Sequence, residues 1–326
     1  MTIPAEIKGA SEVVIGVDTS NYTTSLALLS LEGELLANLK MPLPVKAGER
    51  GLRQSEALFN HIKSLPELIE RLKPYLIGKT AKAIGVSERP RNHEGSYMPC
   101  FLAGVCAAES LGATAGIPVF RFSHQCGHIM AALFSSGALE LAEVGSCFGA
   151  YHVSGGTTEL VRVEAVEDGF ISEVVGGTKD LNAGQVIDRI AVAAGLPFPG
   201  GAHLERCALE FNGRAVRRKP PVDGCYFNLS GLENLAMGLY RDTDNLPLTA
   251  SFVFDYVGTA IARSCESYLE KYGNGPLVFA GGVMSNTCIR KRLENAFDSR
   301  FAEPALSCDN AVGIAALALR RLKKNA

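Results

Sequence analysis

The sequence predicts an α/β protein built from two halves of similar design. Short β-branched runs alternate with longer stretches in which apolar residues recur at helical spacing, a pattern typical of α/β folds. Each half also opens with a strand, a Gly/Ser/Thr-rich turn and a second strand, at residues 13–30 and 145–165. We interpret this echo as a duplicated architecture with a cleft between the halves.

The individual elements follow in order along the chain. VVIGVDTS (13–20) and TTSLALLS (23–30) form a predicted hairpin, and AKAIGVSE (81–88) is a further strand. Helices are predicted over roughly 55–73, over 99–116, from Ser123 onward, from near Ser285 and over about 309–324. PLVFAGGV is a strand, and residues 135–145 look like a linker. The predicted domains are therefore 1–140 and 141–326, with the last helix returning towards the first domain.

Composition limits the function classes. The chain has 326 residues, of which 47% are hydrophobic and 20% charged, and this is typical of a globular protein. No apolar run reaches the ~20 residues of a membrane helix, and the first residues lack a signal-peptide pattern. Nine cysteines without a C-x-x-C spacing favour neither disulfides nor a zinc ribbon. We expect a cytoplasmic protein with no membrane partner.

The net charge of −2 argues against a protein that binds nucleic acid through a generally basic surface, because neutralisation of phosphates supplies most of the affinity for nucleic acid. We expect no DNA partner. An RNA partner has to meet a local basic patch or be held by another subunit. Two runs are candidates, although such runs are more often solvated faces: Arg214, Arg217, Arg218 and Lys219, and Arg320, Arg321, Lys323 and Lys324.

Two Gly/Ser/Thr-rich turns and a third, glycine-containing segment are candidates for nucleotide binding. In GVDTSNYTTS and HVSGGTTE, small residues let backbone N–H groups approach phosphate oxygens, and FAGGVMSN places Gly281 and Gly282 after a strand. Any one of these turns is equally explained by hairpin geometry. Together they match the two phosphate loops and the adenosine loop of the superfamily that contains actin, hexokinase and Hsp70.

His124 and His128 are candidate metal ligands. Ser123 is a plausible N-cap, so the two imidazoles stand at i and i+4 on one helix face and can reach one ion, iron or zinc. The alternative is a pair of hydrogen-bonded histidines. Asp309 and Asp188 are, from spacing alone, a helix N-cap and a residue on the polar face of a helix.

Several segments resemble one family, the TsaD/YgjD proteins. FSHQCGHI is similar to the family's V-H-H-x-x-G-H, and HVSGGTTELV to V-S-G-G-H-T-x-L-V. LNAGQVIDRIAVAAGLPFPGGAHLE, NLSGL, FAGGVMSNTCIRKRL and SCDNAVGIA match further family segments in the same order. The resemblance runs from about residue 12 to residue 322.

The resemblance implies an actin-like (ASKHA, ribonuclease H-like) fold and an N6-threonylcarbamoyltransferase. Such an acyltransferase moves the threonylcarbamoyl group of threonylcarbamoyl-adenylate to N6 of adenosine 37 in tRNA, a tRNA modification carried out with partner proteins. The implied ligands of a divalent metal are His124, His128 and Asp309. The implied contacts to adenine nucleotide or threonylcarbamoyl-adenylate are Ser154, Gly155, Gly156, Asp188, Gly201 and Asn286. No catalytic side chain is assigned.

The sequence departs from the family near the expected phosphates and acceptor. DTSNYTT stands for E-T-S-C-D-E-T, so that Asp18 replaces a glutamate, and SERPRNHEGSYMP, with His93 and Glu94, replaces G-P-G-L. Glu233 replaces a lysine, and Cys126 a glutamate. These changes leave two alternatives: a carbamoyltransferase with another acceptor, or a non-catalytic nucleotide-binding regulator. A zinc peptidase is discounted, because H-E-x-x-H is absent.

Overall fold

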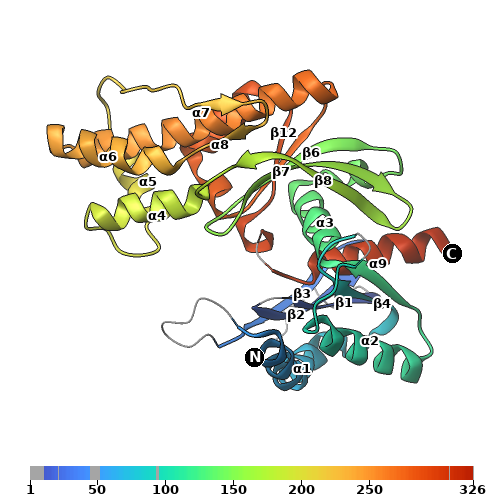
Figure 1. Cartoon of the computed structure of the whole chain (residues 1–326). Coiled ribbons are helices and arrows are strands. Elements are labelled where there is room, and N and C mark those ends of the chain that lie inside the picture. The colour runs from blue at the N-terminus through green and yellow to red at the C-terminus, as the bar shows by residue number, and fades with distance from the viewer. Residues whose placement is uncertain (1–10, 21, 45–51, 93–94, 308, 326) are drawn as a thin grey trace. The chain divides into compact units, whose positions relative to one another are not determined.

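The computed structural model describes the chain except for residues 1–10, 21, 45–51, 93–94, 308 and 326, so His93 and Glu94 lie outside the described part. Its contacts form two compact units (Figure 1). The first comprises Met1–Gly145, Ala165–Ile171 and Leu306–Ala326, and the second Ser146–Glu164 and Ser172–Ala305. The boundary predicted between residues 140 and 141 stays a prediction.

The strands of the first unit are β1 (Glu12–Ser20), β2 (Thr23–Ser30), β3 (Leu35–Pro42), β4 (Thr80–Arg89) and β5 (Val119–Ser123). The later strands are β6 (Cys147–Val153), β7 (Thr158–Val166), β8 (Gly169–Thr178), β9 (Val222–Asp223), β10 (Tyr226–Phe227), β11 (Leu277–Ala280) and β12 (Ser299–Phe301). The α-helices are α1 (Gln54–Leu76), α2 (Phe101–Ala115), α3 (His124–Ser136), α4 (Ala183–Ala193), α5 (Gly201–Leu209), α6 (Ser230–Thr243), α7 (Leu246–Tyr272), α8 (Thr287–Ala296) and α9 (Val312–Asn325).

The two sheets repeat one strand order, which supports the predicted duplication. The first sheet runs β3-β2-β1-β4-β5, and the second runs β12-β11-β6-β7-β8-β10-β9. In both, an antiparallel hairpin (β1–β2 or β6–β7) is extended on one side by parallel strands (β4 and β5, or β11 and β12). Both strand–turn–strand predictions are therefore confirmed.

Helices cover both faces of the first sheet, and the alternation of residues along β1 shows why. Val13, Ile15 and Val17 belong to the hydrophobic cluster that includes residues of α1 and α2. Gly16, on the opposite face, lies against the backbone of α9. Because side chains alternate across a strand, a β1 that is apolar on both faces requires this double cover.

The second unit is organised around α7, whose buried residues pack against the second sheet. The rings of Tyr151 on β6 and Phe279 on β11 stack 6.2 Å apart, and the Tyr151 hydroxyl lies 3.1 Å from Ser264 Oγ on α7. Among the described residues, none of the helices combines the length and the apolarity that crossing a membrane requires.

Three element boundaries differ from the predictions. The expected linker at 135–145 contains a 3-10 helix, η2 (Leu139–Ala142), because buried Ala138 and Ala142 anchor it. The helix expected near Ser285 begins at Thr287, after a 3-10 turn, and Asn286 is its N-cap. The last helix begins at Val312 rather than at 309. The side chain of Asn310, not Asp309, accepts a hydrogen bond from the Val312 N–H (2.9 Å), so the N-cap interpretation of Asp309 is wrong.

Helices α3 and α9 cross at two glycines (Figure 1). A Cβ atom placed on Gly313 would lie 1.8 Å from the carbonyl oxygen of Gly127 and 2.6 Å from the backbone nitrogen of Ala131. A Cβ on Gly127 would in turn meet the side chain of Ile314 at 2.8 Å. The helix backbones are therefore in direct contact, and no larger residue fits at Gly313 without separating the helices.

We predict that Gly313→Ala lowers the free energy of unfolding by roughly 1–3 kcal/mol, the usual cost of overpacking. Urea unfolding would measure it. Gly238→Ala on α6 is the matched control, because a Cβ atom there meets nothing within 4 Å. That variant should be neutral or slightly more stable. Equal stability of the two variants would contradict the close crossing.

Candidate metal and nucleotide sites

The two histidines lie at the start of α3, directly after the buried end of β5. Ser123 Oγ accepts a hydrogen bond from the Cys126 N–H at 3.2 Å, which confirms Ser123 as the N-cap. His124 and His128 then fall one helical turn apart. Cys126 faces elsewhere, since its Sγ lies 3.4 Å from the Phe170 carbonyl oxygen. Burial raises the pKa of the Cys126 thiol.

Asp309 meets both histidines, so three ligand-type atoms converge within the first unit. His124 Nε2 and His128 Nε2 are 2.9 Å apart, and Asp309 Oδ1 lies 3.5 Å and 3.3 Å from them. Ligand atoms bound to one ion at about 2.0–2.2 Å lie about 3–3.5 Å from one another in octahedral or tetrahedral geometry. The three side chains therefore fit one divalent metal ion.

A second carboxylate, that of Asp18, contacts the other ring nitrogen of His124, and sequence analysis did not assign it to the site. Asp18, fully buried at the end of β1, has its Oδ2 atom 3.2 Å from His124 Nδ1. Ser20 Oγ donates to the same oxygen at 2.8 Å, and Ser87 Oγ donates to Oδ1. Asp18 thus accepts a hydrogen bond from the Nδ1–H of His124, and Nε2 faces Asp309 and His128. Metal-binding histidines commonly have such a partner.

These contacts bias the cluster toward holding positive charge. Burial by itself would lower the pKa of His124, but the carboxylates of Asp18 and Asp309 outweigh burial and raise the pKa to about 10. Burial would raise the pKa of Asp309, but hydrogen bonds and charge from His124 and His128 hold it far below its usual range. A cation placed between these groups is therefore electrostatically favoured.

If this cluster holds the metal, His124→Ala and His128→Ala should each abolish bound Zn²⁺ or Fe²⁺ and leave the fold intact. Metal content by plasma mass spectrometry and the far-ultraviolet circular dichroism spectrum would test both points. His203→Ala, on α5 in the second unit, is the control and should retain the metal. Unchanged metal in the His124 variant would contradict the assignment.

Asp18→Asn should weaken metal binding about 10- to 100-fold, the range seen when the partner of a metal-binding histidine is changed. The amide keeps the size of the side chain but loses the charge that fixes the His124 ring. Competition with a chromogenic chelator would give the affinity. A variant with wild-type affinity would show that Asp18 only fills space.

The candidate nucleotide residues all lie in the second unit, beginning at the turn between β6 and β7. Ser154 Oγ accepts from the N–H groups of Gly156 and Thr157 at 3.3 and 3.1 Å, which shapes the turn. Beyond Gly155 and Gly156 there is open space where a side chain would otherwise stand. The Gly184 N–H at the start of α4 donates to the Ser154 carbonyl at 3.1 Å. A ligand can approach this backbone closely.

A series of contacts links the turn to the other candidates. Asp188 on α4 accepts from the Gly200 N–H at 2.8 Å, next to Gly201 at the start of α5. Glu205 on α5 accepts from the Thr287 N–H at 2.7 Å, next to Asn286. Asn286 is buried; its Oδ1 caps α8, whereas its Nδ2 has no hydrogen-bond partner among the described residues. An orphaned buried donor suits a ligand acceptor.

Only two of the six candidate nucleotide residues border the same cavity. Gly155 and Asp188 line a pocket of about 720 Å³, whereas Ser154, Gly156, Gly201 and Asn286 do not. The remaining lining residues are Gln185, Arg189, Val192, Ala193, Phe198 and Glu233. Arg189 pairs with Glu233 at 3.7 Å. Sequence analysis did not single out Phe198, a residue that is 75% exposed and borders this pocket.

Comparison with known proteins settles the family. The model of the family described as TsaD, tRNA N6-adenosine threonylcarbamoyltransferase, matches residues 45–316. The chain belongs to this family. It is 29% identical over 323 residues to the tRNA N6-adenosine threonylcarbamoyltransferases of two Streptococcus suis strains, 05ZYH33 and 98HAH33, covering 94% of this chain and 91% of each relative.

Solved structures confirm the actin-like α/β fold. HypF of T. kodakarensis superposes with a TM-score of 0.59 at 12% identity, covering 97% of this chain and 48% of that one. Component A of the Acidaminococcus fermentans (R)-2-hydroxyglutaryl-CoA dehydratase gives 0.51 at 14% identity, with coverages of 96% and 100%. At such low identity these likenesses show the fold alone.

Proposed function

We propose that this chain transfers the threonylcarbamoyl group from threonylcarbamoyl-adenylate to N6 of adenosine 37 in tRNA. The observation that carries the proposal is the convergence of His124, His128 and Asp309, backed by buried Asp18, in a chain of the threonylcarbamoyltransferase family. A regulator that only binds nucleotide has little need for a metal site with such a buried support.

The first unit supplies the metal ligands. His124, His128 and Asp309 would hold the ion, which when bound provides a Lewis acid and template for anionic oxygens. Asp18 accepts a hydrogen bond from the Nδ1–H of His124, so that a bound ion would displace the Nε2 proton and be held by the Nε2 lone pair. Ser20 and Ser87 in turn hold the Asp18 carboxylate in place. A preorganised site of this kind needs no rearrangement during the reaction.

The second unit supplies the candidate contacts to the adenylate. Gly155 and Gly156 leave room for close backbone approach, Asp188 lies on the pocket wall, and Asn286 offers a buried donor. In the transfer, the N6 amine forms a bond to the carbamoyl carbon while the bond from that carbon to the phosphate oxygen breaks. AMP and one proton are released. The acceptor is itself the nucleophile, so no nucleophilic side chain is required.

The remaining expectations stay proposals as well: partner proteins of a threonylcarbamoylation complex, and a cytoplasmic location. A carbamoyltransferase with another acceptor is the second candidate. The segment that replaces the family's G-P-G-L turn favours it, because Arg89 is held there by Glu88 at 3.0 Å and by Asn92 at 2.8 Å, an arrangement built on side chains instead of glycine backbone.

Asp188→Asn should weaken adenine-nucleotide binding about 10-fold or more, because a charge-assisted hydrogen bond is worth about 1.5–3 kcal/mol. The amide oxygen still accepts from the Gly200 N–H, so the fold should persist. Calorimetric titration with ADP measures the affinity. Asp242→Asn, an exposed residue of α6, is the matched control. Equal ADP affinity in both variants would remove Asp188 from the site.

Complementation tests the proposed function as a whole. The chain is expressed in bacterial cells depleted of their own threonylcarbamoyltransferase of this family, and tRNA nucleosides are analysed by mass spectrometry. Restored threonylcarbamoyladenosine is the expected result, and His124→Ala should abolish it. Absence of the nucleoside, with metal-loaded protein and co-expressed native partners, would favour the second candidate.

A further inference from the structure

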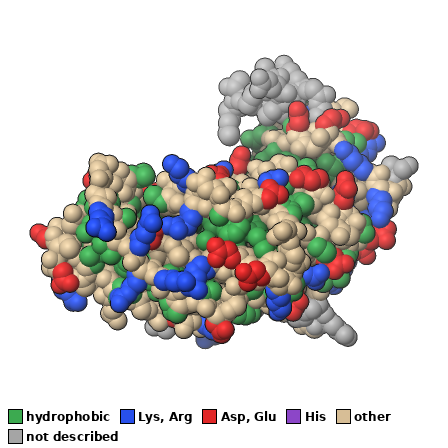
Figure 2. Space-filling view, turned by 90° about the horizontal axis from the view of Figure 1, so that it is seen from above, with side chains coloured by type: hydrophobic (Ala, Val, Ile, Leu, Met, Phe, Trp, Pro, Cys, Tyr) green, Lys and Arg blue, Asp and Glu red, His purple; other side chains and the backbone are tan. Residues whose placement is uncertain are grey.

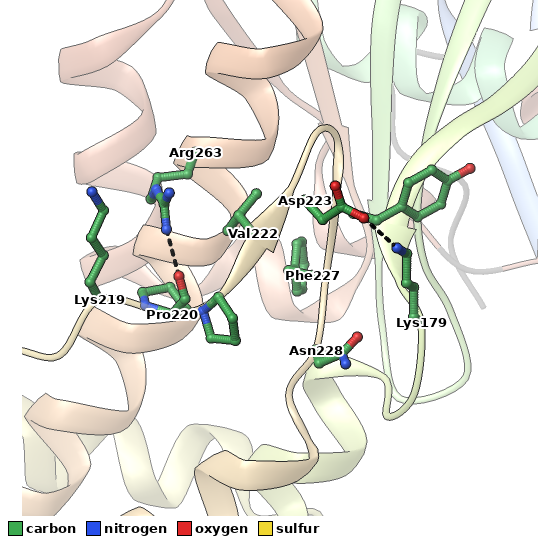
Figure 3. Close-up of a pocket in the computed structure, with 10 residues that line it drawn as sticks. Lys179, Lys219, Pro220, Val222, Asp223, Phe227, Asn228 and Arg263 are labelled. Atoms are coloured by element: carbon green, nitrogen blue, oxygen red, sulfur yellow. Dashed lines mark hydrogen bonds and ion pairs between the residues drawn. The ribbon is translucent and has the colours of Figure 1, made fainter.

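A cationic cavity lies in the second unit, between the β9–β10 hairpin and α7. Its volume is about 480 Å³. Figure 3 shows Lys219 and Arg263 on one side and Lys179 with Asp223 on the other. Three cations and one carboxylate thus line the cavity. Since Lys179 and Asp223 pair at 2.9 Å, Lys219 and Arg263 provide its uncompensated charge.

Arg263 is the most informative of these side chains. It is half-buried on α7, and its Nη1 donates to the Pro220 carbonyl at 2.5 Å (Figure 3). Within the described part of the chain it forms no ion pair. A guanidinium carries five donors, and a partly desolvated one is stabilised by an anion. Arg263 therefore offers an anion-binding position at the cavity.

Lys219 connects the cavity to an exposed basic segment, residues 214–219. This segment contains Arg214, Arg217, Arg218 and Lys219, and no acidic residue stands between Glu210 and Asp223. All four cations are exposed, and none forms an ion pair with another described residue. The nearby carboxylate of Asp180 is occupied, since it accepts from the N–H groups of Leu229 and Ser230 at 2.8 and 3.0 Å.

The charge of this segment contrasts with the net charge of the chain. Figure 2 shows Lys and Arg side chains interspersed with Asp and Glu across the face drawn. The chain as a whole carries −2, whereas the basic segment carries +4 within six residues. An extended run of unpaired cations beside a cavity suits a polyanion, because each phosphate neutralised releases counterions.

We propose that the basic segment and this cavity, with Arg263 at its wall, bind the phosphate backbone of an RNA strand. The inference rests on the proposed function, in which tRNA is the acceptor. An RNA strand is favoured over a single nucleotide, because five unpaired cations exceed what one phosphate group requires. It is favoured over an acidic protein because Tyr226 and Asn228 at the same cavity offer a ring and an amide to nucleobases.

Fluorescence anisotropy with an unmodified tRNA that carries adenosine at position 37 tests the surface, using the full chain at several salt concentrations. Arg263→Gln and Lys219→Gln should each weaken binding roughly 5- to 10-fold at 100 mM salt. Each should also reduce the slope of log affinity against log salt by about 0.7–0.9. Arg300→Gln, a half-buried arginine of the second unit already paired with Asp298, is the charge-matched control and should keep both values.

The outcomes separate this inference from the proposed function. Wild-type affinity and slope in both cavity variants, or no tRNA binding by the wild-type chain, would overturn it, even if complementation succeeds. Loss of ADP affinity without loss of tRNA affinity would identify a nucleotide site and also overturn it. If the variants lose tRNA affinity but the wild-type chain forms no threonylcarbamoyladenosine, the surface stands and the proposed function fails. Unchanged thermal unfolding of the variants would exclude misfolding.

Discussion

The backbone contact between α3 and α9 is the constraint on which the candidate metal centre depends. His124 and His128 stand on α3, and Asp309 precedes α9, about 180 residues later. No local spacing brings these side chains together. They meet because Gly127 and Gly313 let the two helices approach until backbone atoms touch. A side chain at this crossing would separate the helices by more than the tolerance of a metal site, which is a few tenths of an ångström.

The same helix α9 also covers the first sheet, so the packing of the unit and the geometry of the site are coupled. Gly16 on β1 and Gly85 on β4 lie against the backbone of α9. Asp18 and Ser20 lie at the end of β1, and Ser87 lies on β4. The strands that α9 packs against therefore also carry Asp18, which contacts His124, and the two serines that donate to Asp18. Burial of three polar residues at strand ends is tolerable only because each is hydrogen-bonded.

The residues of this site differ in how far sequence could predict them. The histidine pair and its N-cap follow from helical spacing and the preference of serine for the N-cap, which are local properties. Asp309 came from family resemblance, because spacing favoured a capping role that Asn310 fills instead. Asp18 was missed, since its contact with His124 depends on strand order. The available signal was Asp18 itself, an acidic residue inside the largely apolar strand VVIGVDTS. A buried carboxylate without a partner would be costly there.

A similar division applies to the fold and to the second unit. The strand–turn–strand units were predicted from short β-branched runs on either side of a Gly/Ser/Thr-rich turn. The pairing of β1 and β6 with the parallel strands β4, β5, β11 and β12 depends on long crossovers that local patterns do not specify. The basic segment 214–219 was visible as a charge run, and such runs are usually solvated. The structure adds a half-buried arginine from α7, Arg263, which lies beside a cavity and forms no ion pair with another described residue. Net charge therefore does not exclude RNA as a ligand, because screening within about 10 Å makes the local arrangement of charges decisive.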